Sequence, residues 1–475
     1  MKLLRLGPAL GALGIVTAAC SPAVDPAASG TSAELDMVLL VVDGLRVDRL
    51  DALLAAPSLA PLAELLDGDD VLRFDRAYAP SSLAEQSLAS LFSGRLPTHG
   101  GGIGLVEAQP SPDATTLATR LRRAGYRTGF VSQQPWAARP GFTRGFDGLQ
   151  VATAGDDARA PIAHVALRVL AEDLAGPSPA NAPRAPFLLV AHWAAPDLSR
   201  GAAAGRSIEA IASAYDDAML EKLHDAAALL AGLVGPSGAA EREALSRVVV
   251  VLTSSHGFEL LEHGDIGSGF TLHEEVVRVP LVVRLPDRDG RAITEPVSTV
   301  RLLPTLLELA RVEPASGEPT DVTDDRSLLL PSAETPQDPA TPVIAELVVR
   351  ERAIARAVLD GRYKYLQVLR DAPIADRGVI EAGYEELQAG MASGAISTPP
   401  LFGDPVAESL LRLGDDLREE QLPLAAHAPL LSRLRAVLRD YARLCESTGF
   451  TPPAITERMP IDPNDVRELE ALGYM

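Results

Sequence analysis

Short apolar runs alternate with longer amphipathic stretches through the first two thirds of the chain. The apolar runs lie at Met37–Val42, Thr128–Ser132, Phe187–Ala191, Val248–Leu252 and Pro280–Leu285. Such runs, rich in Val and Leu, are typical of strands that are buried on both faces of a sheet. They therefore predict the strands of one buried sheet.

The stretches between these runs have helical periodicity. They include Thr115–Ala124, Ala210–Leu233 and a segment that begins near Leu45. Gly235-Pro236 would end the long helix. Because strands alternate with helices, we expect an α/β fold with a mostly parallel sheet covered by helices on both faces.

The pattern changes after the last of these strands. Residues 313–342 are rich in Pro, Ser, Thr and Asp, and we place a domain boundary there, between an α/β domain over 36–320 and a C-terminal subdomain over 343–475. Ala353–Leu359 and Tyr363–Val368 flank Asp360-Gly361, which favours a hairpin with a tight type I′ turn. Helices are expected at Pro429–Cys445 and Pro463–Leu472, so this subdomain is predicted to be small and α+β.

The first 20 residues have the features of a targeting segment. Lys2 and Arg5 precede an apolar stretch, Leu6–Val16, that is too short to span a bilayer, and Thr17-Ala18-Ala19-Cys20 follows it. This arrangement resembles a bacterial lipoprotein signal, in which Cys20 becomes the lipid attachment site. The alternative is an ordinary secretory signal with an incidental cysteine.

The lipoprotein interpretation predicts an exported protein that is held on a membrane, at the periplasmic or outer surface, by its N-terminal lipid. Residues 21–35 would then form a flexible tether, because they are rich in Ala, Pro, Ser and Gly.

Composition narrows the possible partners. The chain has 475 residues, of which 47% are hydrophobic and 23% charged, as in a globular protein. Its net charge of −21 argues against a nucleic-acid partner, because phosphate backbones need a basic face. With two cysteines, Cys20 and Cys445, no disulfide framework is expected.

Several motifs occur in an order that is specific for one family. They are Val41–Leu50 (VVDGLRVDRL), Ala79–Gly100 (APSSLAEQSLASLFSGRLPTHG), Thr253–Gly257 (TSSHG), Leu272–Leu281 (LHEEVVRVPL) and the terminal Leu472–Tyr474 (LGY). Together they resemble the sulfatase family, within the alkaline phosphatase-like superfamily. The resemblance implies that superfamily's mostly parallel sheet sandwiched by helices.

The resemblance also locates an active site. In the family a Cys, Ser or Thr nucleophile begins the helix of the second motif, and here Ala84 occupies that position. A methyl group cannot attack sulfur or phosphorus, and it cannot be matured to formylglycine. Ser81, Ser82 and Ser87 lie nearby as possible displaced nucleophiles, although such hydroxyls are more often helix caps.

The family's metal ligands are only partly retained. The resemblance places Asp43 and His256 at ligand positions, whereas Ser255 stands where the family has an Asp. Asp43 and His256 would be a weak, vestigial site, because a hard cation needs several oxygen ligands with negative charge. The alternatives are that Asp43 caps the helix that follows it and that His256 is simply held in a Gly-rich turn.

The sequence thus favours a surface-anchored, sulfatase-like pseudoenzyme without a cofactor, which binds a protein or an anionic ligand or has a structural role. The alternative is an active sulfuric ester hydrolase or phosphodiesterase with a displaced nucleophile. That enzyme would need calcium or another divalent cation.

Overall fold

A nine-stranded sheet forms the centre of the protein, with strand order β10-β2-β9-β6-β1-β5-β3-β4 and with β11 also paired to β2. Its strands are β1 (Asp36–Val42), β2 (Val71–Tyr78), β3 (Arg127–Ser132), β4 (Gly148–Val151), β5 (Phe187–Trp193), β6 (Val248–Thr253), β9 (Arg278–Arg284), β10 (Arg291–Ile293) and β11 (Val297–Ser298). All neighbours are parallel except for β9, which is antiparallel to both β2 and β6.

The computed structural model describes residues 35–100, 108–112, 114–151, 161–174, 184–198, 205–234, 245–286, 288–313, 326–329, 342–349, 352–369, 405 and 407–447. All of these belong to one compact unit, Leu35–Met475. The predicted lipoprotein signal with Cys20, nearly all of the tether and the helix expected at Pro463–Leu472 lie outside the described residues. No helix in the described ranges has both the length and the apolar character that crossing a membrane requires.

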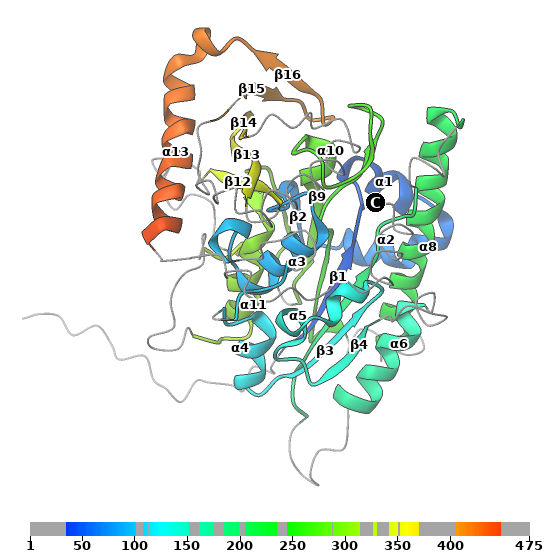
Figure 1. Ribbon diagram of the computed structural model, residues 1–475. Coiled ribbons are helices and arrows are strands. Elements are labelled where there is room, and N and C mark those ends of the chain that lie inside the picture. Colours follow the sequence, from blue (N-terminus) through cyan, green and yellow to red (C-terminus); the bar gives the residue numbers. More distant parts are fainter. Residues whose placement is uncertain are drawn as a thin grey trace, which may run out of the picture. The chain divides into compact units, whose positions relative to one another are not determined.

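Helices cover both faces of the sheet because the side chains of its fully buried strands alternate between two apolar cores. Val38, Leu40 and Val42 of β1 pack in one core, and Met37, Leu39 and Val41 pack in the other. The first core includes residues of α1 (Val47–Leu54), α2 (Ala60–Leu66), α6 (Ile162–Val169) and α8 (Ile208–Val234), and the second includes residues of α3 (Ala84–Ser93), α4 (Leu117–Arg123) and α11 (Leu302–Leu309) (Figure 1).

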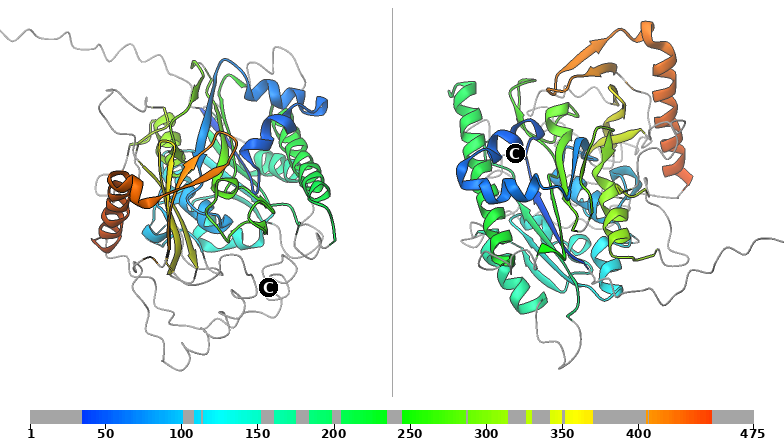
Figure 2. Two further views of the ribbon diagram at one scale, coloured as in Figure 1. Left: turned by 90° about the horizontal axis from the view of Figure 1, so that it is seen from above. Right: turned by 180° about the vertical axis from the view of Figure 1, so that it is seen from behind.

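A second, antiparallel sheet follows, with the order β12-β13-β14-β15-β16. Its strands are β12 (Val343–Val349), β13 (Arg352–Asp360), β14 (Tyr363–Val368), β15 (Ala407–Leu413) and β16 (Glu419–Leu422). One face packs against α13 (Ala428–Ser447), which Figure 2 shows on the outer side of this sheet. The other face packs against residues around α10 (Glu274–Val277) and the start of α3.

Short elements connect these layers. They are η2 (Pro57–Leu59), η3 (Pro97–His99), η4 (Pro135–Ala138), α5 (Pro140–Thr143), the π-helical turn η6 (Leu170–Leu174), β7 (Glu259–Leu260), β8 (Ile266–Gly267), η7 (Thr299–Arg301) and η8 (Leu424–His427).

A buried carboxylate joins the second sheet to η3, the segment after α3. Glu346 of β12 accepts hydrogen bonds from the backbone N–H and hydroxyl of Thr98 (3.0 and 2.8 Å), from Arg356 Nε (2.8 Å) and from the Tyr441 hydroxyl (3.0 Å). Glu346 has no exposed surface, so its charge depends on these partners. The segment after α3 is therefore fixed to the second sheet.

The structure confirms the predicted α/β class, with a mostly parallel sheet between helices and a small C-terminal subdomain built on an antiparallel sheet. The hairpin is confirmed as β13–β14, but its predicted turn type is wrong. Gly361 and Arg362 are the central residues, and only Gly361 has a positive φ (58°), as in a type II′ turn rather than a type I′ turn.

Candidate functional site

The carboxyl ends of β1, β3, β5 and β6 bring a group of polar side chains together. In the sheet register, Val41 of β1 lies opposite both His192 of β5 and Thr253 of β6. Asp43 follows β1 directly, and Ser255 and His256 follow β6, so they emerge at the same sheet edge. Ligands of open α/β sheets bind at this edge.

Asp43 is fully buried, with no exposed surface. Its Oδ2 lies 2.8 Å from His192 Nε2, and its Oδ1 accepts a short hydrogen bond from the Ser255 hydroxyl. Burial alone would raise the pKa of Asp43. His192, His256 and the Ser255 hydrogen bond outweigh this effect, so that the pKa lies below its usual value. Asp43 is therefore an ionised carboxylate with a hydrogen bond at each oxygen.

The prediction that Asp43 caps the following helix is wrong. The chain makes a turn at Gly44, with φ of 78°, and α1 begins three residues later at Val47. The N-cap residue of α1 is Arg46, which makes no side-chain capping bond. The Asp43 carboxylate points into the group at the sheet edge instead.

His192 was not among the site residues predicted from the sequence. Its Nδ1 lies 2.9 Å from the Ser132 hydroxyl, and its ring lies against Trp136 with the centroids 5.5 Å apart. A hydrogen-bonded chain thus runs from Asp43 through His192 to Ser132, and all three residues are buried. The sequence signal for this partner was the position of His192 directly after the apolar run Phe187–Ala191.

His256 is held by the turn that contains it. Its Nδ1 donates to the Gly257 carbonyl at 2.6 Å, and its own carbonyl accepts from the Gly44 N–H at 3.0 Å. Burial lowers the pKa of His256, with Asp43 opposing the shift, so the ring is neutral near pH 7. Gly257 is required here, since a Cβ would lie 2.1 Å from the Glu275 carbonyl oxygen.

Apolar groups fill the space next to Gly44, where many family members have a second acidic residue. A Cβ at Gly44 would lie 3.1 Å from Pro196 Cδ and 3.2 Å from a ring carbon of Phe258. Phe258 is 4% exposed and packs on Tyr215 with a centroid distance of 5.5 Å. A carboxylate at position 44 would therefore meet an apolar wall.

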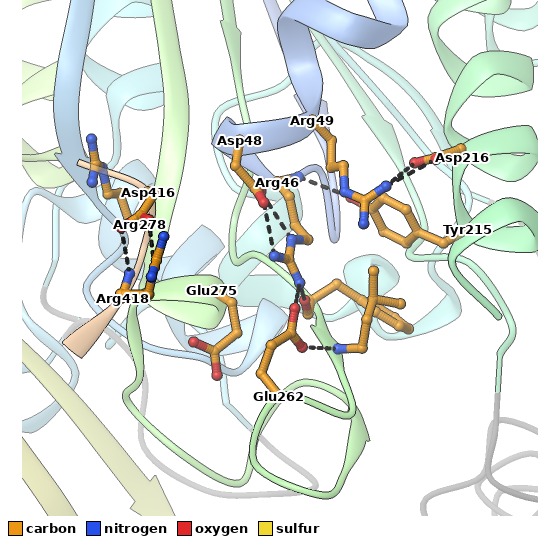
Figure 3. Close-up of polar contacts among 12 residues, drawn as sticks. Arg46, Asp48, Arg49, Tyr215, Asp216, Glu262, Glu275, Arg278, Asp416 and Arg418 are labelled. Atoms are coloured by element: carbon orange, nitrogen blue, oxygen red, sulfur yellow. Dashed lines mark hydrogen bonds and ion pairs between the residues drawn. The ribbon is translucent and has the colours of Figure 1, made fainter. Parts of the chain in front are cut away.

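Arg46 fixes the chain after Asp43 to the loop between β7 and β8 (Figure 3). Its guanidinium binds Asp48 at 2.9 Å and Glu262 at 2.5 Å, and it donates to the Phe258 carbonyl at 3.0 Å. The Arg46 N–H donates to the Tyr215 hydroxyl at 2.9 Å, and that hydroxyl donates to the Gly44 carbonyl at 2.7 Å. The backbone around Asp43 is thus set by the buried Tyr215 of α8, by the Phe258 carbonyl and by Glu262 on this loop.

Ala84 is the first residue of α3 and is 5% exposed. The next residue, Glu85, interacts electrostatically with Asp43 and His192, which places the start of α3 beside the group at the sheet edge. Burial raises the pKa of Glu85, and Arg139 opposes that shift. Where the family has a nucleophile, this chain has a methyl group followed by an acidic side chain.

The nearby serines differ in how they are bound. Ser81 Oγ contacts Gln86 Oε1 at 2.9 Å and accepts from the Leu83 N–H, and Ser87 Oγ donates to the Ser81 carbonyl at 2.7 Å. These two hydroxyls stabilise the turn before α3. The buried Ser82 hydroxyl has no hydrogen-bond partner among the residues that the structure describes.

The residues present do not fit a hard divalent cation. Asp43 is the single carboxylate between His192 and Ser255, and both of its oxygens already accept hydrogen bonds. A calcium ion takes 6–8 oxygen ligands. In the described part of the chain, Asp43 belongs to none of the side-chain groups whose donor atoms converge closely enough to hold a metal.

Comparisons with known proteins agree with this architecture. The sequence profile described as Sulfatase matches residues 36–229 and 238–312. "Uncharacterized sulfatase YidJ" of Escherichia coli (strain K12) is 38% identical over 64 residues, which are 14% of this chain and 13% of that protein. The chain thus matches only a small part of that curated relative.

Solved structures resemble much more of the chain. BT4656, in complex with its substrate D-glucosamine-2-N,6-O-disulfate, has a TM-score of 0.60 and 16% identity, and the match covers 90% of this chain and 100% of that one. BT1596, a 2-O GAG sulfatase, has a TM-score of 0.59 and 16% identity, with 87% and 93% covered. The yidJ protein from Bacteroides fragilis has a TM-score of 0.60 and 15% identity, with 87% and 96% covered. At these identities the likeness establishes the fold, and the profile match establishes that this chain belongs to the sulfatase family.

Proposed function

We propose that this chain is a catalytically inactive, sulfatase-like protein with a binding or structural role. One observation carries the proposal: the start of α3 presents the methyl group of Ala84 beside an Asp43 carboxylate whose hydrogen bonds are supplied by His192 and Ser255. Active members of the family use a divalent cation together with a nucleophile. This chain offers neither a hydroxyl or thiol at Ala84 nor a donor set for the cation.

The charges of the site favour a protein partner over an anionic ligand. Asp43 is ionised, and the partly buried Glu85 lies close enough to interact with it electrostatically. Lys222 of α8 also interacts with Asp43, but burial lowers its pKa and so weakens it as an anion-binding group. A sulfate ester placed beside Ala84 would lie near the ionised Asp43 carboxylate, and like charges at this range repel.

Turnover assays test the proposal. The purified protein is incubated with aryl sulfates and with phosphodiesters, in separate reactions with Ca²⁺, Zn²⁺ or Mn²⁺. We expect no turnover above that of the matched Asp43→Asn variant. Robust turnover that Asp43→Asn abolishes would overturn the assignment as a pseudoenzyme.

A second candidate is a sulfuric ester hydrolase or phosphodiesterase with a displaced nucleophile. The hydrogen-bonded chain Asp43–His192–Ser132 favours it, since a serine beside a histidine that a carboxylate orients is an activated nucleophile. Two observations count against it: Ser132 is 2% exposed, and its Oγ already accepts from the Gln134 N–H at 3.0 Å. The same assays decide, because activity lost in Ser132→Ala but kept in Ser82→Ala would identify Ser132.

The membrane anchor is a separate proposal that depends on Cys20 alone. We expect the wild-type chain, expressed from its own signal in a bacterium, to be exported and to fractionate with membranes. The Cys20→Ser variant should be released into the soluble fraction. Retention of this variant in the membrane fraction would refute lipid anchoring through Cys20.

A further inference from the structure

The stretch that contains α4, β3 and β4 has the opposite charge to the rest of the chain. Residues 114–151 contain six arginines and a single acidic residue, Asp147, although the whole chain has a net charge of −21. Four of these arginines lie around the starts of β3 and β4: Arg122 and Arg123 at the end of α4, Arg127 as the first residue of β3, and Arg144 shortly before β4. We call these four residues the basic edge.

The basic edge lies at the end of the sheet opposite the Asp43 site. Because β1, β3, β4 and β5 are parallel, they all begin at one end of the sheet and finish at the other, where Asp43 lies. Arg127 is paired with Phe187 of β5, whose N–H donates to Asp36 at the start of β1 at 3.0 Å. Arg127 is therefore level with Asp36 and two strand spacings, about 10 Å, away from it. Figure 1 shows α4 at the lower end of the sheet, away from α1 and α10.

Three of the arginines line one hollow of about 390 Å³, together with Thr119 and Gly145. Arg144 donates to the carbonyls of residues 110–112 and 114 at 2.6–3.2 Å, and these bonds fix its guanidinium without neutralising its charge. Arg122 pairs with Asp147 at 2.7 Å, but its side chain is 59% exposed, so this ion pair is weak. Among the described residues, the hollow thus has an excess of positive charge, which suits a phosphate group.

The N-terminal segment joins the body at this same end of the sheet. β1 begins at Asp36, so residues 21–35 lead to the end where the basic edge lies. If Cys20 carries the lipid that we propose, these residues limit the distance between the bilayer and the body to about 50 Å when they are fully extended. The anchor would therefore hold the basic edge, rather than the Asp43 site, close to the membrane.

We propose that the basic edge is a docking surface for an anionic lipid bilayer, with a lipid phosphate in the hollow. The inference rests on the proposed anchor at Cys20, which supplies the neighbouring membrane. Arginines near an anionic bilayer are attracted to it, and the attraction falls off within a Debye length, about 8 Å at physiological salt. The charges at the contact therefore outweigh the acidic residues elsewhere on the chain.

The acidic groups at the same end of the sheet do not cancel the basic edge. Asp36 is 2% exposed and already forms an ion pair with Arg184. Glu172 belongs to η6, which follows α6, and α6 covers the face of the sheet opposite to α4. Docking through the basic edge would turn the Asp43 site away from the bilayer, where it remains accessible to a protein partner.

The test measures binding to vesicles by the full chain with Cys20→Ser, which cannot be lipidated. The vesicles consist of phosphatidylcholine alone or of equal parts of phosphatidylcholine and phosphatidylglycerol, and the readout is the difference in affinity between the two. In this background, Arg122→Gln/Arg123→Gln removes two charges from the basic edge. Circular dichroism establishes that the variant is folded.

The matched control is Arg412→Gln/Arg418→Gln, which removes two exposed arginines, each paired with a carboxylate, from the β15–β16 hairpin. Arg278, the first residue of β9, donates to the carbonyl of Gly414 in this hairpin (3.4 Å). Because β9 is antiparallel to β6, Arg278 lies at the Asp43 end of the sheet, and Figure 3 shows it beside Arg418. The control thus has the same change of charge at the opposite end of the molecule.

We expect tighter binding to the anionic vesicles than to the neutral ones, and binding at least ~10-fold weaker for the Arg122/Arg123 variant but not for the control. Raising the salt from about 0.1 M to about 1 M, which shortens the Debye length from about 10 Å to about 3 Å, should abolish the preference. The proposal is overturned if the chain does not prefer anionic vesicles, or if the control variant weakens binding equally.

Two further results keep the interpretation unambiguous. If ultracentrifugation shows a salt-sensitive dimer that only the Arg122/Arg123 variant disrupts, and vesicles are not bound, a second copy of the chain occupies the basic edge and the proposal fails. Membrane fractionation of wild type and Cys20→Ser at about 1 M salt, where the basic edge no longer binds, tests the lipid anchor separately. Failure of the anchor and failure of the docking surface are thus distinguishable.

Discussion

Replacing Ser255 with Asp tests the electrostatics of the site directly. The Ser255 hydroxyl donates to Asp43 Oδ1, so it stabilises a buried carboxylate. Ser255→Asp exchanges this donor for the acidic group that the family has at this position. Without a cation, the new carboxyl and Asp43 would repel each other.

The loss of stability in Ser255→Asp can be estimated in two ways, from the repulsion between the two charges and from the cost of protonating one of them. Two unit charges about 4 Å apart at an effective dielectric constant near 20 repel by about 4 kcal/mol. The protein can avoid this repulsion by protonating the new carboxyl, whose ordinary pKa is about 3.9, and each pH unit then costs about 1.36 kcal/mol. Near pH 7 both limits give about 4 kcal/mol, so we expect the free energy of unfolding to fall by about 3–4 kcal/mol.

The pH dependence follows with a definite sign. Repulsion raises the folded-state pKa of the new carboxyl above its unfolded value, so the destabilisation is present above that folded pKa and is lost as the pH falls. The loss of stability should therefore shrink by about 1.4 kcal/mol for each pH unit between pH 7 and pH 5. Excess Ca²⁺ should restore part of the stability, since two adjacent carboxylates attract a hard cation.

Urea unfolding in EDTA at several pH values measures this change, with Ser255→Asn as the control of similar size without charge. The Asn variant should lose less than about 1.5 kcal/mol, with no comparable pH dependence, because its amide can still donate to Asp43. If Ser255→Asp and Ser255→Asn were equally stable at pH 7 in EDTA, Asp43 would not be the ionised, hydrogen-bonded carboxylate described above.

Three further predictions concern the stability of the folded chain. For each variant, urea or thermal unfolding measures the change in the free energy of unfolding. Glu346→Gln should lower the free energy of unfolding by about 3–5 kcal/mol, because it breaks the buried ion pair between Glu346 and Arg356; a loss below about 1 kcal/mol would contradict this. Gly44→Ala should lower the free energy of unfolding by about 1–3 kcal/mol more than Gly361→Ala does. Both glycines have a positive φ, but only at Gly44 would a Cβ lie against neighbouring side chains; equal losses for the two variants would refute the steric argument. Asp43 has a lowered pKa, so its contribution to stability is present above its unfolded value of 3.8 and is lost as the pH falls through the folded value. Asp43→Asn should therefore be less sensitive to acid below pH 4 than the wild-type protein, and identical pH profiles would contradict the assigned shift.

The buried parts of the fold were predictable because their sequence pattern has one physical cause. Met37–Val42 and Val248–Leu252 are apolar at every position because β1 and β6 are covered on both faces. The last two strands had no such signal. β15 reads AESLLRL and β16 reads EEQL, and both are half exposed, so their pattern does not distinguish them from loop or helix.

From the sequence, only those site residues could be predicted to lie together that directly follow adjacent parallel strands. Asp43, Ser255 and His256 do meet at one edge, as polar residues that follow adjacent parallel strands should. Their partners depend on contacts between distant segments, which no local pattern encodes. For this reason the bond from His192 to Asp43 and the approach of Glu85 were missed.

Two clusters of buried carboxylates differ in how their negative charge is balanced. At the sheet edge, the hydroxyl of Ser255 and the ring of His192 satisfy Asp43, so the folded chain has no electrostatic need for a cation there. At the junction of the two sheets, Glu275 and Glu419 instead pair with His263 and His273, and Glu274 and Glu419 pair with Lys364. In both places the described side chains of this chain therefore supply partners for the buried carboxylates.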